Sequence, residues 1–521
     1  AVEAVRAPAD ALAPHAFLST SGAPAGIIPA ASSSGGRIPP RLAICGTSCK
    51  LTSGLSTMAT MARFASSASD LVSEVPLSRW NAAHLPVELP PGVASRARHG
   101  AFVDGAQLFD HGAFHISLAE AAAADPQQRL VLEHGYAALH SMGSTRDTLL
   151  GSGTGVAVGI YATEFAQVLA AGPLASSVYA STGASLSVAC GRMSFALGLH
   201  GPCASFETAC SASLVACHSA ARALQHCECD AHLAVGVNLM LLQSSSVGMA
   251  IAGMTSVAGR SHTFDRRADG FARGEGASAL GATRDEGQLV ACGSAVRQDG
   301  RSASLTAPSG PAQQGLLRSA LVDAGAAADA LLLHEAHGTG TALGDPIEAG
   351  SLAGATLAAR RSGAALVVGS VKGNLGHGES TAGVAGLLKL AVGLECGHGA
   401  ANPQLRALNA RVGGALRGRI VALPTQLVGM RNVRRAGGVS SFGYSGTIAH
   451  AAMRREAAES DTLLVQRLLA YKRSVFPWAA CATSASCITT GSSTSTFAAV
   501  WSAAPQVDTM LLHSYLLMRA H

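Results

Sequence analysis

The stretch SFETACSASLVACHSAARAL (residues 205–224) changes from a strand-like pattern to a helical one at Cys210. At the amino terminus of a helix, unsatisfied N–H groups and the helix dipole stabilise a thiolate. Small neighbours on both sides would leave the sulfur accessible. Residue type alone nevertheless favours a small core residue for any single cysteine. The role of Cys210 therefore depends on the segments that accompany it.

The composition predicts a large folded core. The chain has 521 residues, of which 48% are hydrophobic and 13% are charged, enough for one large domain or two fused domains. With 59 glycines and 4% aromatic residues, close backbone approach favours a layered α/β protein over a β-sandwich. The net charge of +5 comes from 37 basic and 32 acidic residues that are interspersed. We therefore expect no nucleic-acid partner.

Cysteine spacing and the lengths of the apolar runs argue against a disulfide-rich, a zinc-binding or a membrane-spanning protein. The 12 cysteines fit neither a disulfide framework nor a zinc-binding pattern, so we expect a reducing compartment and no metal site. The longest apolar candidate, HLAVGVNLMLLQSSSVGMAIAGM (232–254), is interrupted by Asn238 and by the polar run 243–246. A membrane-spanning helix needs about 18 uninterrupted apolar residues. We expect no membrane span.

Composition and hydrophobic pattern divide the chain into four parts. Residues 1–40 are rich in Ala, Pro, Ser and Gly, and no acidic residue occurs in 11–69, which resembles a transit peptide or a flexible linker. We therefore expect a plastid location, with a cytoplasmic enzyme that carries a linker as the alternative. Two α/β halves are expected over 41–290 and 291–455, followed by a linker or remnant over 456–521.

A second chemical segment is LLLHEAHGTGTALGDPIEAG (331–350). His337 follows an apolar strand-like run and precedes a loop with the hydroxyls of Thr339 and Thr341. An isolated histidine there is more often a hydrogen-bonded structural residue. The loop lacks both the GxGxxG and the Walker spacing, so nucleotide binding is not expected.

Two further segments follow the same pattern of a strand that ends in a polar turn. In SVKGNLGH (370–377), glycines leave the imidazole of His377 accessible, and Lys372 offers a fixed positive charge. In GGVSSFGYSGTIAH (437–450), the backbone N–H of Tyr444 lies in a turn that could face a site. Open α/β sheets place their sites at the carboxyl ends of strands.

Together these segments resemble the β-ketoacyl synthase domains of type I polyketide synthases. The motifs that carry the resemblance, in family order, are DPQQRLVLE, GRMSFALGLHGP, ETACSAS, TFDRRADGFARGEG, VRQDGRSASLTAPSGPAQQ, EAHGTGT, LGDPIEA and VKGNLGH. The resemblance covers roughly residues 41–455. It implies an α/β, thiolase-like fold in which two pseudo-duplicated halves form layered αβαβα architecture.

The resemblance also implies a reaction. Cys210 would accept an acyl chain from the phosphopantetheine of an acyl carrier protein, with an oxyanion hole formed by the backbone N–H groups of Cys210 and Tyr444. His337 and His377 would stabilise the enolate formed when a malonyl thioester loses carbon dioxide. The expected activity is the decarboxylative condensation of polyketide or fatty acid biosynthesis, with no bound cofactor.

Supporting roles and partners follow from the same resemblance. Thr339 and Thr341 match positions that contact the pantetheine arm, and Lys372 matches a lysine that organises the histidines. The chain carries no acyltransferase or carrier-protein signature, so the acyl carrier protein is expected to act in trans. Thiolase-fold enzymes usually pair through a sheet edge, so we also expect a homodimer.

The chain departs from the family pattern at several positions: Glu207 replaces the usual Asp, Ala212 a Ser and Ile448 an Asn, while Gly373 and Gly378 replace bulkier residues. An apolar residue at position 448 is expected to loosen the oxyanion loop or to alter substrate choice. No departure removes a catalytic group. The entry to the fold before EVPLSRW lacks the expected Phe-Pro-Gly stretch.

Two other functions compete with the condensing enzyme. A catalytically silent subunit of the chain-length-factor kind keeps the fold but lacks the nucleophile, whereas Cys210, His337 and His377 are all present here. A coenzyme A-dependent thiolase uses a second cysteine near its carboxyl terminus instead of two histidines. The residues therefore favour the condensing enzyme over both.

Overall fold

A computed structural model describes the fold. The residues that it describes are 42–82, 89–161, 163–285, 287–361, 364–430, 435–456 and 469–478. The chain divides into residues 1–40 and 41–521, and all described residues belong to the second unit. The leader predicted over residues 1–40 and most of the linker predicted over residues 456–521 lie outside the described residues.

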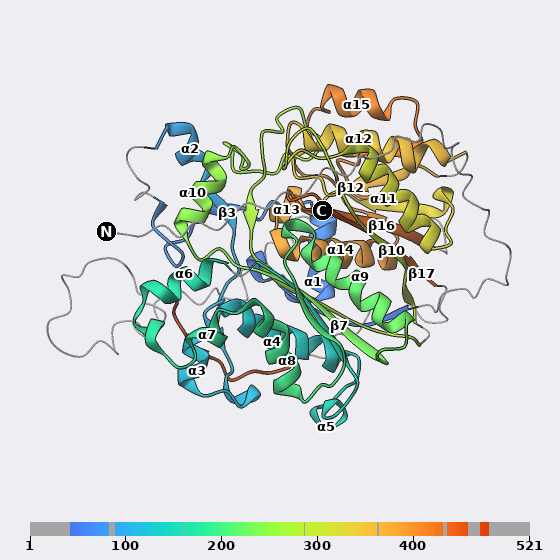
Figure 1. The fold of residues 1–521 in the computed structure, drawn as a ribbon. Helices are drawn as coiled ribbons and strands as arrows, with labels where there is room; N and C mark the ends of the chain where they lie inside the picture. The colour runs from blue at the N-terminus through green and yellow to red at the C-terminus, as the bar shows by residue number, and fades with distance from the viewer. Residues whose placement is uncertain are drawn as a thin grey trace, which may run out of the picture. The chain divides into compact units, whose positions relative to one another are not determined.

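Eleven strands form the main sheet (Figure 1). Its first half contains, in spatial order from the middle of the sheet to one edge, β1 (Leu42–Leu51), β9 (Gly276–Thr283), β7 (Ala231–Asn238), β5 (Gly155–Ile160) and β6 (Cys203–Phe206). Its second half contains, in spatial order toward the other edge, β10 (Leu289–Gln298), β17 (Thr447–Arg455), β16 (Arg435–Phe442), β11 (Leu331–Glu335), β12 (Leu366–Gly369) and β14 (Val421–Ala422).

The two halves repeat one topology. From the middle of the sheet to its edge, five strands of each half follow one another in the same order. Counted along the chain, that order is first, fifth, fourth, second and third, and β14 has no counterpart in the first half. Each half also has antiparallel pairs near the middle of the sheet and parallel pairs toward its edge. The halves are joined where β1 and β10 pair antiparallel, with Leu42 opposite Ala291. The predicted pseudo-duplicated α/β fold is confirmed.

Helices complete the predicted layers. α9 (Ala212–Gln225) packs on β5 and β7 of the first half, on β10 and β17 of the second half, and on α14 (Ala382–Cys396). α4 (Pro126–Ser141) and α8 (Leu186–Leu197) cover the other face of the first half, whereas α11 (Gly310–Asp323), with α12 (Gly344–Ala355) packed on it, covers β10 and β17. Figure 1 shows α9 and α14 between these outer helices. α14 is buried along nearly its whole length, as expected for a helix that is apolar on all sides.

The remaining elements are short or peripheral. They include the helices α1 (Met58–Ser67), α2 (Pro91–Arg96), α3 (Leu118–Ala123), α5 (Arg146–Leu149), α6 (Thr163–Ala171), α7 (Ala180–Gly183), α10 (Gln243–Ile251), α13 (Lys372–Leu375) and α15 (Ala410–Leu416). The small sheets contain β2 (Ser73–Glu74), β3 (His99–Ala101) and β8 (Arg273–Gly274); β13 (His398–Gly399) and β15 (Val428–Gly429); and β4 (Leu108–Phe109) and β18 (Ser474–Val475). No helix in these described ranges is long and apolar enough to cross a membrane.

Glycines allow the central helices to approach the strands. A Cβ atom on Gly159 of β5 would lie 2.3 Å from the backbone nitrogen of Ser213 in the first turn of α9. A Cβ atom on Gly383 of α14 would lie 2.8 Å from Cβ of Leu214. Real Cβ atoms do not approach so closely, so these positions require glycine. Glycine at these two positions therefore lets the central helices pack closely on the strand and on each other.

Equivalent turns precede the two central helices. The turn η5 (Ala209–Ser211) connects β6 to α9, and η8 (Glu379–Thr381) precedes α14. The first residue of each turn has left-handed backbone, with φ of 52° at Ala209 and 47° at Glu379. Such values are uncommon for residues other than glycine and occur often at functional sites.

The described part of the carboxyl-terminal segment packs on the first half of the fold. Its strand β18 pairs with β4. Arg473 forms an ion pair with Glu133 at 2.9 Å, and Phe476 is buried in the same core cluster as Phe109. Residues 469–478 are therefore part of the folded unit.

Candidate active site

Residues from both halves line one cavity of about 360 Å3. Its wall includes six residues that the sequence singled out: Cys210, His337, His377, Thr339, Thr341 and Tyr444. Because the halves repeat one topology, the carboxyl ends of β6, β11 and β12 bring these distant segments together. Lys372 is the one predicted site residue that does not line the cavity.

Cys210 lies in η5, at the start of α9, as the sequence predicts. Its carbonyl oxygen accepts a hydrogen bond of 2.6 Å from Oγ of Ser441 on β16. Burial, and after it the charge of Glu379, raise the pKa of the thiol to about 12. Lys372 and the backbone N–H groups of Tyr444 and Cys210 lower this pKa. The predicted stabilisation by the helix terminus is therefore outweighed by burial, so the resting sulfur is a protonated thiol.

His337 follows the end of β11 and is held through its backbone and its ring. The carboxylate of Glu348 accepts the N–H groups of His337 and Gly338, both at 2.7 Å. The N–H of Phe442 donates to Nδ1 of the ring at 3.2 Å. Burial, and then the charges of Lys372 and His377, hold the pKa of His337 well below 6.5. The neutral ring therefore carries its proton on Nε2.

His377 has the same tautomer for an equivalent reason. The N–H of Glu379 donates to Nδ1 of His377 at 3.3 Å. Its Nε2 is buried and has no hydrogen-bond partner among the described residues. The ring lies edge-on to Phe271 and to His337, with centroids 5.0 and 5.5 Å apart. Burial, Lys372 and Arg273 lower the pKa of His377. Both histidines are therefore N–H donors rather than bases.

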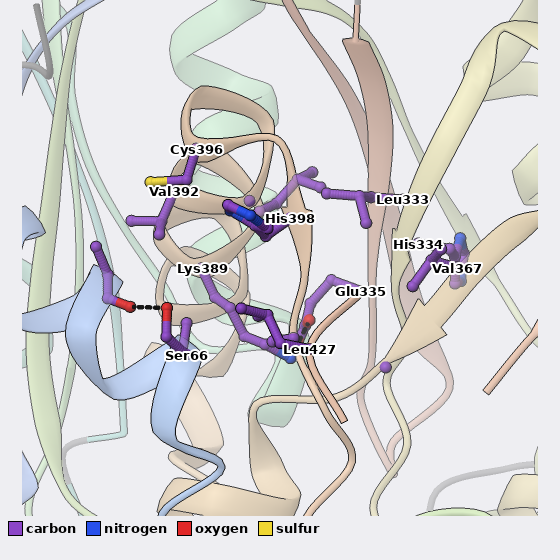
Figure 2. A pocket seen from close by; sticks show the side chains of 16 residues that line it. Ser66, Leu333, His334, Glu335, Val367, Lys389, Val392, Cys396, His398 and Leu427 are labelled. Atoms are coloured by element: carbon purple, nitrogen blue, oxygen red, sulfur yellow. Dashed lines mark hydrogen bonds and ion pairs between the residues drawn. The ribbon is translucent and has the colours of Figure 1, made fainter. Parts of the chain in front are cut away.

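Lys372 lies in α13 and is only 2% exposed. Burial lowers its pKa, whereas the carboxylates of Glu335 and Glu348 raise it. Glu335 accepts the N–H of Val371 and forms a buried ion pair with Lys389, with Nζ and Oε2 at 2.7 Å. Figure 2 shows this pair in the lining of a separate small pocket. Lys372 is thus part of a buried charge network next to the site.

The loop that carries Tyr444 is closed by its own backbone. The N–H of Gly443 donates to the carbonyl of Thr447 at 2.8 Å, and the N–H of Gly446 donates to that of Gly443 at 2.9 Å. Ile448 is fully buried and packs with Leu316 and Phe442. The loop is therefore held without a polar side chain at position 448.

Several site residues were not predicted from the sequence. Glu348 lies within LGDPIEA and Phe271 within TFDRRADGFARGEG, motifs that carried the resemblance without an assigned role. Met249 and Met254 also line the cavity, but no motif indicated them. No group of three His, Cys, Asp or Glu residues in the described chain could hold a metal ion.

Comparison with known proteins identifies the family. The chain matches the β-ketoacyl synthase N-terminal domain over residues 40–285 and the C-terminal domain over residues 289–406. The chain belongs to the β-ketoacyl synthase family. The predicted kinship with the ketosynthase domains of polyketide synthases is confirmed by relatives and by solved structures.

Two curated relatives are components of the phenolphthiocerol/phthiocerol polyketide synthase of Mycobacterium tuberculosis. One is 38% identical over 419 residues, which cover 78% of this chain and 22% of that protein. The other is 40% identical over 424 residues, which cover 78% of this chain and 19% of that protein. The chain thus spans about a fifth of the length of these two relatives.

Solved ketosynthases share the fold. A mutant form of the ketosynthase from module 6 of the bacillaene synthase of Bacillus subtilis 168 has a TM-score of 0.75 and 31% identity, covering 81% of this chain and 73% of that chain. The oxazolomycin ketosynthase domain OzmH KS7 of Streptomyces albus JA3453 has a TM-score of 0.74 and 28% identity, covering 80% and 74%. These similarities confirm the thiolase-like fold.

Proposed function

We propose that the protein is a β-ketoacyl synthase that condenses an acyl group on Cys210 with a malonyl unit carried by an acyl carrier protein. One observation carries this proposal. Cys210, His337 and His377 line the same cavity, and both rings are held in the tautomer that carries its proton on Nε2. A silent subunit would need none of these features.

The first half-reaction is acyl transfer. The sulfur of Cys210 attacks the thioester carbonyl of the incoming acyl chain, and the N–H groups of Cys210 and Tyr444 stabilise the tetrahedral oxyanion. The bond from the carbonyl carbon to the pantetheine sulfur then breaks. The departing thiol leaves with the proton that the thiol of Cys210 gave up, so the acyl-enzyme is neutral.

The second half-reaction forms the carbon–carbon bond. The malonyl thioester loses carbon dioxide, and the electron pair of the broken bond forms an enolate whose oxygen accepts the Nε2–H groups of His337 and His377. The enolate carbon attacks the acyl carbon on Cys210. The carbon–sulfur bond breaks, the thiolate of Cys210 takes a proton from solvent, and a β-ketoacyl thioester leaves. We propose that the hydroxyls of Thr339 and Thr341 contact the pantetheine arm.

Replacing Cys210 by Ala is expected to abolish acyl loading, because no other thiol lines the cavity among the described residues. Mass spectrometry after incubation with an acyl-carrier protein measures the loading. Cys217→Ala is the matched control, since Cys217 is a half-buried thiol on α9 outside the cavity. Unacylated wild type would support the silent-partner alternative. Condensation of acyl-coenzyme A without release of carbon dioxide would support a thiolase.

We also propose that the protein forms a homodimer through β6. This strand pairs only with β5 among the described strands, and its residues Cys203 and Ala204 are exposed. Phe195 on the neighbouring helix α8 is 90% exposed. An unpaired edge beside an apolar side chain is a surface that a second copy can cover. Sedimentation at micromolar concentration should give twice the chain mass and a lower mass for Phe195→Glu. A wild-type monomer would contradict the dimer.

A further inference from the structure

A buried arginine connects three segments next to the cavity. Arg273 of β8 is 3% exposed, and its guanidinium donates to both carboxylate oxygens of Glu379, at 2.5 and 3.1 Å. It also donates to Oε1 of Glu164 at 3.3 Å and to Oγ of Ser246 at 2.9 Å. Glu164 is separately satisfied by the N–H groups of residues 241 and 242. The closest charge contact of Arg273 is therefore with Glu379.

Glu379 is the residue that fixes the ring of His377. Its backbone N–H donates to Nδ1 of the ring, and its left-handed φ of 47° places that N–H there. The segment around Arg273 also binds the backbone of His377. The N–H of His377 donates to the carbonyl of Ala272 at 2.6 Å, and the N–H of Gly274 donates to the carbonyl of His377 at 2.8 Å. A strained residue persists only when its surroundings hold it. The two hydrogen bonds from Arg273 to the carboxylate of Glu379 constrain this residue in that way.

The carboxylate of Glu379 also faces the nucleophile. Glu379 and Cys210 line the same cavity, and the negative charge opposes formation of the thiolate. The other groups that act on Cys210 are the ammonium of Lys372 and the backbone N–H groups of Tyr444 and Cys210, all of which favour the thiolate. The nearby rings of His337 and His377 are neutral. Arg273 is the cation that directly offsets Glu379.

We propose that Arg273 and Glu379 act as a pair of positioning residues, which together fix the orientation of His377 and balance the charge that faces Cys210. The proposal rests on the proposed roles of His377 and Cys210. The pair itself touches neither the acyl group nor the enolate in the proposed reaction. Its two members should therefore affect the thiol in opposite directions, which loss of structure alone would not produce.

Iodoacetamide alkylation of the full chain tests this proposal without any substrate. The rate at Cys210 is followed by peptide mass spectrometry between pH 7 and 10. Glu379→Gln removes the opposing charge, so we expect roughly tenfold faster alkylation at a given pH. Arg273→Met leaves Glu379 unbalanced, so we expect alkylation slower by a similar factor. Rates that change in the same direction, or do not change, would overturn the proposal.

Two further variants keep the test decisive. Arg273→Met with Glu379→Gln removes both charges, so alkylation should return to within about threefold of wild type; a rate as slow as that of Arg273→Met alone would contradict the proposal. Arg79→Met is the matched control, because Arg79 forms the same bidentate pair with Glu275, and Glu275, unlike Glu379, does not line the cavity. It should leave the alkylation rate unchanged. If Arg273→Met does not fold, the direction of the Glu379→Gln change still decides.

Condensation gives a second readout. Arg273→Met should lower the condensation rate about tenfold or more while acyl loading falls less, because only condensation needs His377. Equal losses in both steps would count against a positioning role. If wild type itself did not condense, the proposed function would fail, whereas the alkylation result would stand on its own.

Discussion

Replacing His377 by Ala is expected to lower the condensation rate by about 100- to 1000-fold, because each donor to a developing oxyanion contributes about that factor. The same loss is expected for His337→Ala. Acyl loading at Cys210 should persist in both variants, since the oxyanion hole of that step is formed by backbone N–H groups. Loading is measured by intact mass spectrometry, and condensation by release of carbon dioxide together with the ketoacyl product.

His398→Ala is the matched control for this experiment, because His398 is exposed and lies outside the cavity. Its condensation rate should equal that of wild type. Melting temperatures of all variants separate a catalytic loss from unfolding. If His337→Ala and His377→Ala lost loading and condensation equally, the histidines would not be specific donors to the enolate. The proposal that Cys210 serves loading and the histidines serve condensation would then be wrong.

Replacing Gly159 by Val is expected to disrupt the core. The added Cβ would lie 2.3 Å from the backbone nitrogen of Ser213, and backbone cannot move aside as a side chain can. Overpacking of this kind costs about 1–3 kcal/mol or more. Because Ser213 is in the first turn of α9, the strain should also displace Cys210. We expect a lower melting temperature and a loss of acyl loading.

Gly191→Ala is the matched control for Gly159→Val. Gly191 lies inside α8, and nothing lies within 4 Å of the position that its Cβ would take. Alanine there should stabilise the protein by about 0.5–1 kcal/mol, because glycine is the poorer helix former. Thermal unfolding checks both signs. A Gly159→Val variant as stable as wild type would contradict the packing described for β5 and α9.

The order of the motifs, and the family resemblance that it carries, predicted the roles of Cys210, His337 and His377. Residue type alone favoured a core role for the cysteine and a structural role for an isolated histidine. The family resemblance implied two pseudo-duplicated halves, but the order of the strands within each half was not predicted. It also did not predict the partner of Arg273, since 106 positions separate it from Glu379.

Burial explains the main difference between sequence and structure at the nucleophile. The helix terminus at Cys210 is a local feature and favours a thiolate, whereas the enclosure that raises the pKa of the thiol is built from both halves. For Ile448, a looser oxyanion loop or an altered substrate choice stays a prediction. In the structure its side chain lies in an apolar cluster, and the loop closes through backbone hydrogen bonds. Neither the enclosure nor the apolar cluster can be deduced from neighbours in the chain.

The equivalent turns before α9 and α14 carry different side chains at matching positions, so the two halves of the fold contribute differently to the site. Counting from the start of each turn, Cys210 in the first half corresponds to Ser380 in the second. The hydroxyl of Ser380 donates to the carbonyl of Val237 in β7, so it links the second half of the fold to the first. The first half of the fold therefore supplies the sulfur, and the second half supplies the two imidazoles that line the same cavity.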